Sequence, residues 1–452
     1  MRLWLKILMV AGMTLAILVP LMLIRGTIHE RQAYRHEAVR DIAANFGGRQ
    51  VFGGPVLVVP YVDTVEEDVV QGEGDVRRVV QRKPGSLTFF PESLAIDGTL
   101  QPDTRRRGLH EVRVYQWDGV AVARFDVRLP PVEGTATRRE LGRPWLSYGI
   151  ADVRGLRGTP QLQVGGRTLT PLQGIGHGDG PGLHVRLDAP GDDGRIVLDT
   201  RIELQLRGTE TFAMMPYGRS NDLRLASSWR HPKFEGVSPQ HDIDGSGFRA
   251  RWQVASVASN AQRRYLQDPA LAVPERFRDA AADLPWSPQP DGVSVSLVDP
   301  VNPYLQADRA TKYGLLFVLL TFVGFFMFEL LKRLPIHPIQ YGLVGLAIAM
   351  FFLLLVSLSE HVAFGLAYLC ATIACIGLIG FYLAAVLRST ARGLGFATML
   401  AALYAALYGL LVSEDNALVL GAGLLFLILA AIMVATRKVD WYQLSVRTAT
   451  PG

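Results

Sequence analysis

Ionisable side chains lie inside or at the ends of apolar stretches long enough to cross a membrane, where charge is costly and usually functional. They are Glu329, His337, Glu360 and His361, and Gln340 shares a short motif with His337. Carboxylate and imidazole groups at such depth have the chemistry of a proton relay or of a coupling ion pair. The first two residues border one loop, whereas the last two follow the next apolar run, about a bilayer thickness away at roughly 1.5 Å per helical residue. We therefore expect two separate structural or coupling sites, one at each membrane face.

Glu329 also has an ordinary structural explanation. Lys332 and Arg333 follow it at helical spacing, so an interfacial ion pair is the expected arrangement. Between the two faces, the stretch from Gly342 to Val356 holds no ionisable residue. A relay needs such groups spaced through the hydrocarbon, so the pattern favours structure over proton transfer.

Signatures of common enzymes and cofactor sites are missing from the sequence. It has no Walker run, no Gly-x-Ser-x-Gly elbow and no His-Glu-x-x-His pair. The glycines from Gly174 to Gly182 do not follow the dinucleotide spacing, so we interpret them as a mobile loop. His29 and His36 stand two helical turns apart, too far to hold one ion without other ligands. We expect no enzymatic activity, no catalytic residue, no cofactor and no metal.

One segment has part of a calcium-loop pattern. Asp242-Ile-Asp-Gly-Ser-Gly247 has oxygen donors at its first, third and fifth places and glycine at its sixth. Its twelfth place is Gln253 instead of the bidentate glutamate, and a strand pattern follows instead of a helix. An Asx-type turn is the expected structure.

Apolar runs near both ends of the chain predict the elements that position these residues. The first run ends at Arg25, is too long for a signal peptide and lacks a small-residue cleavage site, so we expect an uncleaved signal anchor. Five more runs of about membrane-spanning length follow. They are Tyr313 to Leu331, Ile339 to Ser357, Val362 to Leu387, Leu394 to Val412 and Ala417 to Thr436.

Charges in the short loops predict the orientation. The basic residues fall on one side, and the loops Ser357 to His361 and Ser413 to Asn416 contain no Lys or Arg. Because basic loops stay in the cytoplasm, both termini are expected inside. Arg25 and its neighbours oppose this orientation, but long domains translocate largely regardless of charge. The predicted organisation is a signal-anchor helix at 1–24, a periplasmic domain at 25–312, a bundle of five transmembrane helices at 313–436 and a cytoplasmic tail at 437–452.

Strand patterns fill most of the exported segment. Ile28 to Phe46 first predicts a helix that continues the first span and stops at Gly47-Gly48. Period-two alternation then predicts strands, with two-residue hairpin turns at Asp118-Gly119 and Gly165-Gly166. Further strands are expected at Arg195 to Leu206, Asp222 to Ser228 and Gly247 to Ala258, and a helical or irregular stretch at Gln262 to Asp283. The fold class is a multi-pass α-helical membrane protein with a large β-rich periplasmic domain, antiparallel and sandwich-like.

The net charge and the positions of the cysteines limit the classes of binding partner and the means of stabilising the exported domain. The 452 residues carry a formal net charge of +5, and no basic run alternates with aromatic residues, so nucleic acid is excluded. Both cysteines, Cys370 and Cys375, lie in one apolar run, so no disulfide can stabilise the exported domain. The expected partners are the lipid bilayer and a periplasmic or envelope component.

Several stretches resemble the CreD family of inner-membrane proteins. The most specific are Ile336-His-Pro-Ile-Gln-Tyr-Gly-Leu-Val-Gly345 and Ser357-Leu-Ser-Glu-His361, and Gly54-Pro-Val-Leu-Val-Val-Pro-Tyr61 and Ser228-Trp-Arg-His-Pro-Lys-Phe-Glu-Gly236 accompany them. The resemblance implies an inner-membrane location, a role in cell-envelope integrity, and effects on colicin and β-lactam tolerance. It implies no catalytic or cofactor residue.

Three functional hypotheses remain at this point. The leading one is a non-enzymatic protein whose exported domain binds an envelope component or partner while the bundle anchors it or reports its state. A small transporter or permease is the alternative, although it needs polar residues near mid-bilayer and usually internal repeats. A hydrolase is the third, but Cys370 and Cys375 have no nearby histidine in their apolar run.

Overall fold

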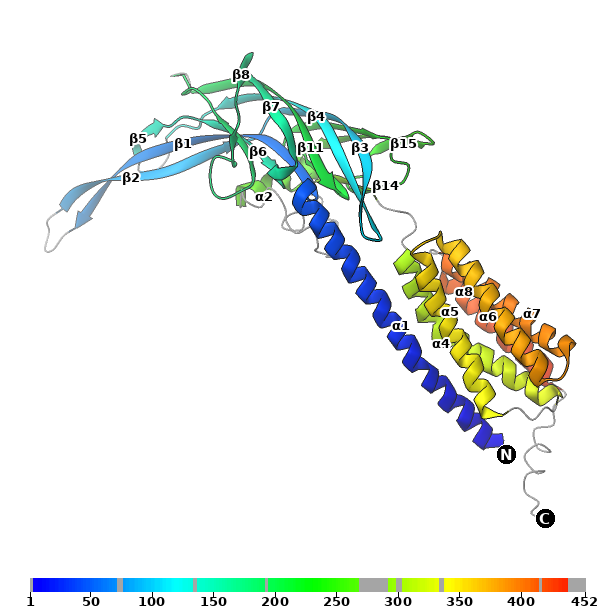
Figure 1. Cartoon of the computed structure of the whole chain (residues 1–452). Helices are drawn as coiled ribbons and strands as arrows, with labels where there is room; N and C mark the ends of the chain where they lie inside the picture. Colours follow the sequence, from blue (N-terminus) through cyan, green and yellow to red (C-terminus); the bar gives the residue numbers. More distant parts are fainter. Residues whose placement is uncertain are drawn as a thin grey trace. The chain divides into compact units, whose positions relative to one another are not determined.

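The computed structural model describes residues 3–70, 76–132, 136–191, 194–267, 292–297, 303–332, 337–413 and 417–437 (Figure 1). The chain forms two compact units. One unit is Arg35–Pro300, the β domain, and the other combines Met1–Tyr34 with Val301–Gly452, the membrane unit. The predicted boundaries at residues 25 and 312 are the positions where the apolar runs end. The two units divide elsewhere, because the first helix continues beyond residue 25 and the next long helix already begins before residue 312.

The first helix, α1, is one continuous element of 44 residues, Leu3–Phe46. The predicted helical extension beyond the first span is therefore confirmed. The helix stops where the sequence indicates: Gly47 has a φ of 109° and donates its N–H to Ala43 O at 2.9 Å. A side chain at that φ would be strained, so glycine ends the helix there.

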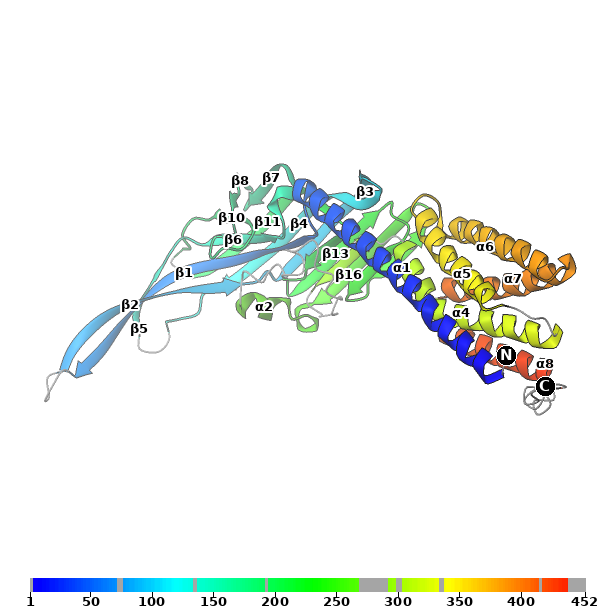
Figure 2. The same cartoon turned by 60° about the horizontal axis from the view of Figure 1, so that its bottom comes forward.

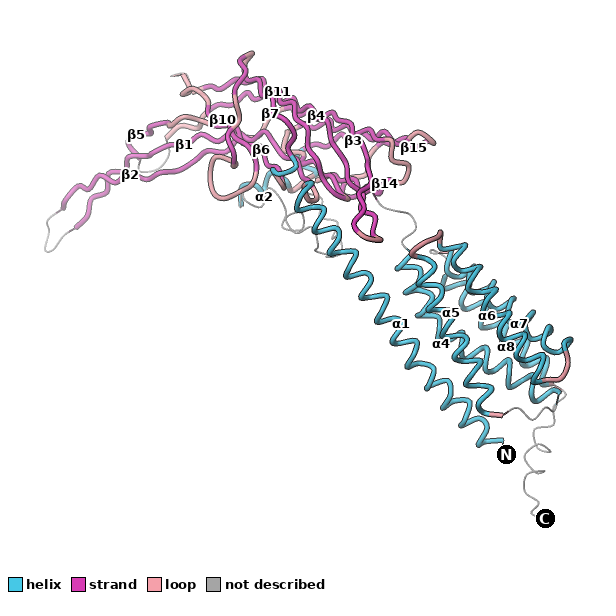
Figure 3. The backbone as a smooth tube through the Cα atoms, viewed as in Figure 1, coloured by secondary structure: helices cyan, strands magenta, loops and turns pink. Residues whose placement is uncertain are grey.

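Helices fill the membrane unit (Figure 3). They are α4 (Pro303–Lys332), α5 (Pro338–Ser359), α6 (Phe364–Val386), α7 (Thr390–Val412) and α8 (Ala417–Thr436), one for each predicted C-terminal run. Among the described residues, four helices are long and apolar enough to cross a membrane: the α1 part Ala11–Phe46, α5, α6 and α7. Helix α4 contains two apolar segments, Gln306–Gly314 and Leu316–Phe326, with a bend of 41° between them. Counted together as one span, they give a fifth membrane-crossing helix. The apolar part of α8, Val419–Val434, is shorter.

The β domain consists of two mixed, mainly antiparallel sheets. The first runs β14-β17-β12-β1-β6-β10-β9, and β2 and β5 also pair with β1. Its strands are β1 (Gln50–Val70), β2 (Val76–Phe89), β5 (Ala136–Leu141), β6 (Trp145–Ile150), β9 (Leu172–Gln173), β10 (Gly182–Arg186), β12 (Thr211–Met215), β14 (Pro232–Gly236) and β17 (Val293–Leu297). Strands β1 and β2 extend together as a long ribbon beyond the other strands of this domain (Figure 2).

The second sheet runs β15-β16-β13-β3-β4-β11-β7-β8. Its strands are β3 (Ser93–Arg107), β4 (His110–Arg128), β7 (Leu156–Val164), β8 (Arg167–Leu169), β11 (Arg195–Thr209), β13 (Ser220–Ser227), β15 (Gln240–Asp244) and β16 (Gly247–Ala255). Short helices η1 (Val153–Gly155), η2 (Ser256–Ala258) and α2 (Ala261–Gln267) connect strands. The strands predicted at β11, β13 and β16 are confirmed. The pairs β1–β12 and β3–β13 are parallel, which the sequence reading did not include.

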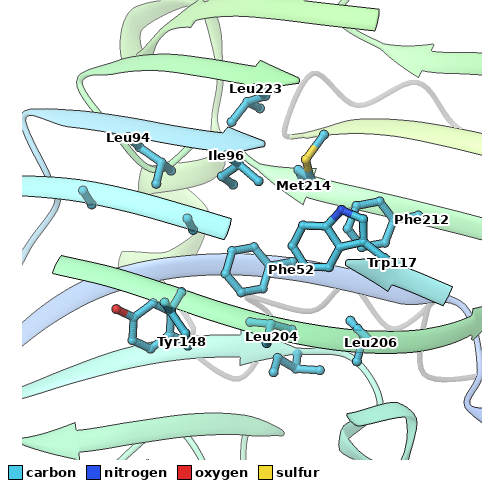
Figure 4. Packing of buried hydrophobic residues seen from close by; sticks show 14 of the residues in the cluster. Phe52, Leu94, Ile96, Trp117, Tyr148, Leu204, Leu206, Phe212, Met214 and Leu223 are labelled. Atoms are coloured by element: carbon cyan, nitrogen blue, oxygen red, sulfur yellow. The ribbon is translucent and has the colours of Figure 1, made fainter. Parts of the chain in front are cut away.

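Apolar side chains from both sheets form one core (Figure 4). Phe52, Tyr148, Phe212 and Met214 come from the first sheet, and Leu94, Ile96, Trp117, Leu204, Leu206 and Leu223 come from the second. Alternation in the sequence produces this arrangement: along β3, Leu94, Ile96, Gly98 and Leu100 are buried, while Ala95, Asp97 and Thr99 are exposed. The β-rich, sandwich-like fold class is thus confirmed.

The predicted hairpin turn at Asp118-Gly119 is wrong. Both residues lie within β4, where Gly119 pairs with Gly98 of β3 on one side and with Leu204 of β11 on the other. The indole of Trp117 occupies the space beside these two glycines, so glycine is needed there for close packing and not for a turn. The β3–β4 turn lies earlier, at Gly108, which has a φ of 57°.

The second predicted turn, Gly165-Gly166, is confirmed. It joins β7 to β8, Val164 pairs with Arg167, and the two glycines have φ values of 55° and 79°. Positive φ at both central positions is what a type I′ hairpin requires. Of the predicted helical or irregular stretch at 262–283, residues up to Gln267 lie in α2, and the remainder lies outside the described residues.

Candidate functional site

The motif around His337 begins helix α5. Ile339 N donates to His337 Nδ1 at 3.4 Å, and His337 N donates to the Gln340 side-chain oxygen at 3.2 Å. Pro338 occupies the first helical turn, where its missing N–H costs nothing. His337 and Gln340 therefore form a reciprocal cap for the unpaired N–H groups at the start of the helix.

Glu329 is buried in the membrane unit, with a relative exposure of 5%. Tyr341 of α5 donates its hydroxyl to Glu329 at 2.8 Å. The Tyr341 ring also contacts Phe322 and Phe325 of α4 at centroid distances of 5.8 and 4.6 Å. The side chains of Lys332 and Arg333, the partners expected from the sequence, lie outside the described residues. The described contact ties α4 to α5 through a buried carboxylate.

The second motif lies at the opposite end of α5. Glu360 is the C-terminal cap residue and pairs with Arg31 of α1, with Arg31 Nε 3.5 Å from Glu360 Oε1. His361 Nδ1 lies 3.2 Å from Ser357 O, and Ser359 donates to Val356 O at 2.8 Å. The Glu329–His337 and Glu360–His361 positions are thus separated by a helix of 22 residues, roughly 33 Å long.

Glycines between these ends bring α5 close to α1. A side-chain carbon added at Gly345 would meet Ile17 of α1 at 2.7 Å and Phe322 of α4 at 2.8 Å, and one at Gly342 would meet Met13 at 2.7 Å. Small residues permit such close helix packing in membranes. The motif from Ile336 to Gly345 therefore specifies both the start of α5 and its contact face.

A second set of contacts, which the sequence reading missed, fixes the end of α1 on the β domain. We call it the α1 joint, and its centre is Glu210. Glu210 pairs with Arg35 at 3.6 Å and with Arg49 at 3.1 Å. Its φ of 58° lies in the left-handed region, which costs a non-glycine residue about 1 kcal/mol. It stands where the chain passes from β11 in one sheet to β12 in the other.

Gln50 and Asp152 complete the α1 joint. The Gln50 amide donates to Asp152 O at 2.9 Å and to Arg207 O at 2.8 Å, and Gly48 N donates to Asp152 Oδ2 at 3.0 Å. Burial raises the pKa of the Asp152 carboxyl, but hydrogen bonds from Arg154 and from the Gly48 N–H outweigh burial and hold that pKa below its ordinary value. No local spacing in the sequence signals this cluster, because its members come from distant segments.

The CreD family model, described as inner membrane protein CreD, matches residues 2–442 and so spans both units. The chain belongs to the CreD family. It is 35% identical over 443 residues to the inner membrane protein CreD of Escherichia coli (strain K12), and the match covers 96% of this chain and 93% of that protein. This CreD-family chain is therefore a multi-pass inner-membrane protein, as the resemblance implied.

Two loops of this CreD-family chain correspond to the predicted Asx-type turn and to the predicted mobile, glycine-rich loop. Asp244 accepts hydrogen bonds from Ser246 N at 2.7 Å and Ser246 Oγ at 2.5 Å in the turn before β16, which confirms an Asx-type turn. In the glycine-rich loop, Ile175 is buried and the ring of His177 lies 5.8 Å from that of Trp145. Within the described ranges, no group of three or more His, Cys, Asp or Glu residues could hold a metal ion.

Proposed function

We propose that this CreD-family protein supports cell-envelope integrity without enzymatic activity, by binding an envelope component through its β domain outside the cytoplasm. In this proposal the membrane unit anchors the β domain, and α1 connects the two. The observation that carries it is the single helix α1, which belongs to both units and has polar and apolar contacts in each.

In the membrane unit, the first part of α1 packs into the bundle. Ile17, Leu21, Ile24 and Ile28 join the apolar core, and Arg25 Nε lies 3.3 Å from Asp308 Oδ1 of α4. Lys312 also contacts Asp308, at 2.8 Å. The pairs Arg25–Asp308 and Arg31–Glu360 attach α1 to α4 and to α5 at the end of the bundle where Glu360 lies.

In the β domain, the last part of α1 packs on sheet residues. Val39, Ile42 and Phe46 contact Val112 and Val114 of β4. The guanidinium groups of Arg207 and Arg105 lie 4.9 and 5.6 Å from the centre of the Phe46 ring. Such cation–π contacts add to the ion pairs of the α1 joint. A helix fixed at both ends is suited to couple the state of a binding domain to a membrane anchor.

The polar groups of the bundle give less support to the transporter alternative. Thr311 and Thr321 donate to carbonyl groups of their own helix. The segment from Gly342 to Val356 has no ionisable residue. A transport site near mid-bilayer normally presents such groups to a pathway.

We predict that both termini face the cytoplasm and that the β domain faces the periplasm, because the short loops alternate in Lys and Arg content. A reporter that is active only in the cytoplasm should work when fused at Gly452 and fail when inserted at Gly180. A periplasm-specific reporter should give the reverse pattern. Cytoplasmic activity at Gly180 would refute this orientation.

Glu360→Gln should lower tolerance to envelope stress, because it removes the charge that pairs with Arg31. We expect a loss of about 1 kcal/mol in the attachment of α1, given that Arg31 is partly exposed. Colicin or β-lactam survival of cells with equal protein levels measures the effect. Glu92→Gln is a matched control, since it breaks an exposed pair with Arg219 in the β domain.

The same variants separate the proposal from the transporter alternative. Vesicles that contain the purified full-length protein should show no proton or solute flux that depends on Glu360. If wild-type vesicles show a flux that Glu360→Gln abolishes at normal abundance, the protein is a transporter and the proposal fails.

A further inference from the structure

A pocket of about 290 Å³ opens in the β domain where the two sheets meet at one end. Residues from both sheets line it. Arg186 ends β10 and Leu187 to Pro190 follow it, Arg195 to Leu198 begin β11, and the β7–β8 hairpin contributes Val164, Gly165, Arg167 and Leu169. Strands β7, β8, β10 and β11 lie together in Figure 2. The other end of β11 leads into Glu210 of the α1 joint.

Polar and apolar surface contribute about equally to the pocket lining, and most of its apolar side chains come from β7, β8 and β11 and from the segment after β10. Val164 and Ile196 are buried, Leu169 and Leu198 are half-buried, and Val197 remains 50% exposed. The apolar part of the lining gains free energy when an apolar group displaces its water. The mixed lining therefore suits a ligand that has both an apolar and a polar part.

The rim is positively charged. Three arginines and one aspartate line the pocket. Arg167 pairs with Asp188 at 2.7 Å, and Arg195 binds Asp126 through two hydrogen bonds of 2.9 and 2.7 Å. Arg186 has no ion-pair partner among the residues that the structure describes. The Arg167 guanidinium, with a further contribution from Arg143, holds the pKa of Asp188 below its usual value.

The contribution of these charged residues to the stability of the fold does not explain why they surround the pocket. The side chains of Arg167 and Asp188 are 74% and 79% exposed, and exposed pairs contribute little to stability. Arg186 likewise forms no ion pair with any of the described residues that would explain its place beside the pocket. It does offer a planar group of N–H donors that matches a carboxylate or phosphate.

We propose that this pocket binds a small amphiphile with one anionic head group, a carboxylate or a phosphate, and a short aliphatic chain. Arg186 binds the head group and the apolar residues of β7 and β11 receive the chain. The inference rests on the proposed function and deepens it, because it assigns a chemical class to the envelope component. Fatty acids and single-chain phosphate esters are the two sources of this chemistry.

Photolabelling of the full-length protein in lipid nanodiscs tests the proposal. The probe is octanoic acid with a diazirine in its chain, and mass spectrometry locates the labelled residues. Labelling should fall within 164–198, and octanoate or octyl phosphate should compete while octanol should not. Competition by one anion alone identifies the head group and still supports the proposal.

Matched variants give the decisive comparison. Arg186→Gln should weaken labelling about tenfold through loss of a charge-assisted hydrogen bond. Arg201→Gln, on the same strand but outside the pocket, should label like wild type. The melting temperature of each variant should match wild type, so that the loss reports binding.

Three results would overturn the inference. They are labelling of Arg186→Gln equal to that of wild type, competition by octanol as strong as that by the two anions, and labels found only outside the pocket. Cell survival separates this failure from failure of the proposed function. If Arg186→Gln loses binding but keeps envelope tolerance, the pocket binds its ligand and the link to envelope integrity is refuted. If no pocket binding occurs while Glu360→Gln still loses tolerance, only the ligand assignment falls.

Discussion

Gly98→Ala should destabilise the β domain by about 3 kcal/mol, because the added methyl group overlaps the Trp117 ring. Trp117 cannot move away easily: it is fully buried, and its ring centre lies 5.3 Å from that of Phe52 and 4.6 Å from that of Phe212. The backbone cannot give way either, since Gly98 pairs with Gly119 inside a continuous ladder. The melting temperature of the full-length protein in nanodiscs, followed by circular dichroism of its β signal, should fall by roughly 6–10 °C.

Gly245→Ala is the matched control for this change. Gly245 lies in the β15–β16 turn, has no atom within 4 Å of an added side-chain carbon, and does not adopt a positive φ. It should alter stability by no more than about 0.5 kcal/mol. If both alanine variants melt at the wild-type temperature, Trp117 does not require the space above Gly98 and the assigned role of this glycine pair is wrong.

Gly345→Val should separate α1 from α5 in the membrane unit. Gly345 lies where α5 approaches both Ile17 of α1 and Phe322 of α4, and each contact leaves no room for a branched side chain. Phe322 is fully buried and contacts Tyr341, so its displacement would also disturb the hydrogen bond to Glu329. We expect a loss of about 2–4 kcal/mol, read as a lower melting temperature on size-exclusion chromatography in detergent and as reduced cellular abundance.

Gly377→Val separates this packing effect from the general cost of a β-branched residue in a helix. Gly377 lies in α6, and no atom lies within 4 Å of an added side-chain carbon. Both variants incur the same intrinsic helix change, so the control should keep nearly wild-type stability and abundance. Equal loss in the two variants would mean that close α1–α5 contact does not stabilise the bundle.

Local sequence determined much of this protein. Runs of apolar residues specify the helices, because each helix satisfies its own backbone hydrogen bonds and lipid accepts its side chains. The end of α1 at Gly47 and the turn at Gly165-Gly166 follow from the φ values that glycine alone adopts without strain. The placement of His337 and Glu360 at opposite ends of α5 follows from helix length. Each of these features depends on residues that are neighbours in the chain.

Only the tertiary structure decided the features that join distant segments. Asp118-Gly119 has the sequence of a turn, but Trp117 and the opposing Gly98 make it the middle of a strand. Tyr341 reaches Glu329 because α4 and α5 pack together, and no spacing rule identifies such a pair. Glu210 becomes the centre of the α1 joint because Arg35 and Arg49, far away in sequence, converge on it. Local preferences amount to about 1 kcal/mol or less per residue, whereas burying an aromatic ring is worth about 1.5–3 kcal/mol, so packing prevails where the two disagree.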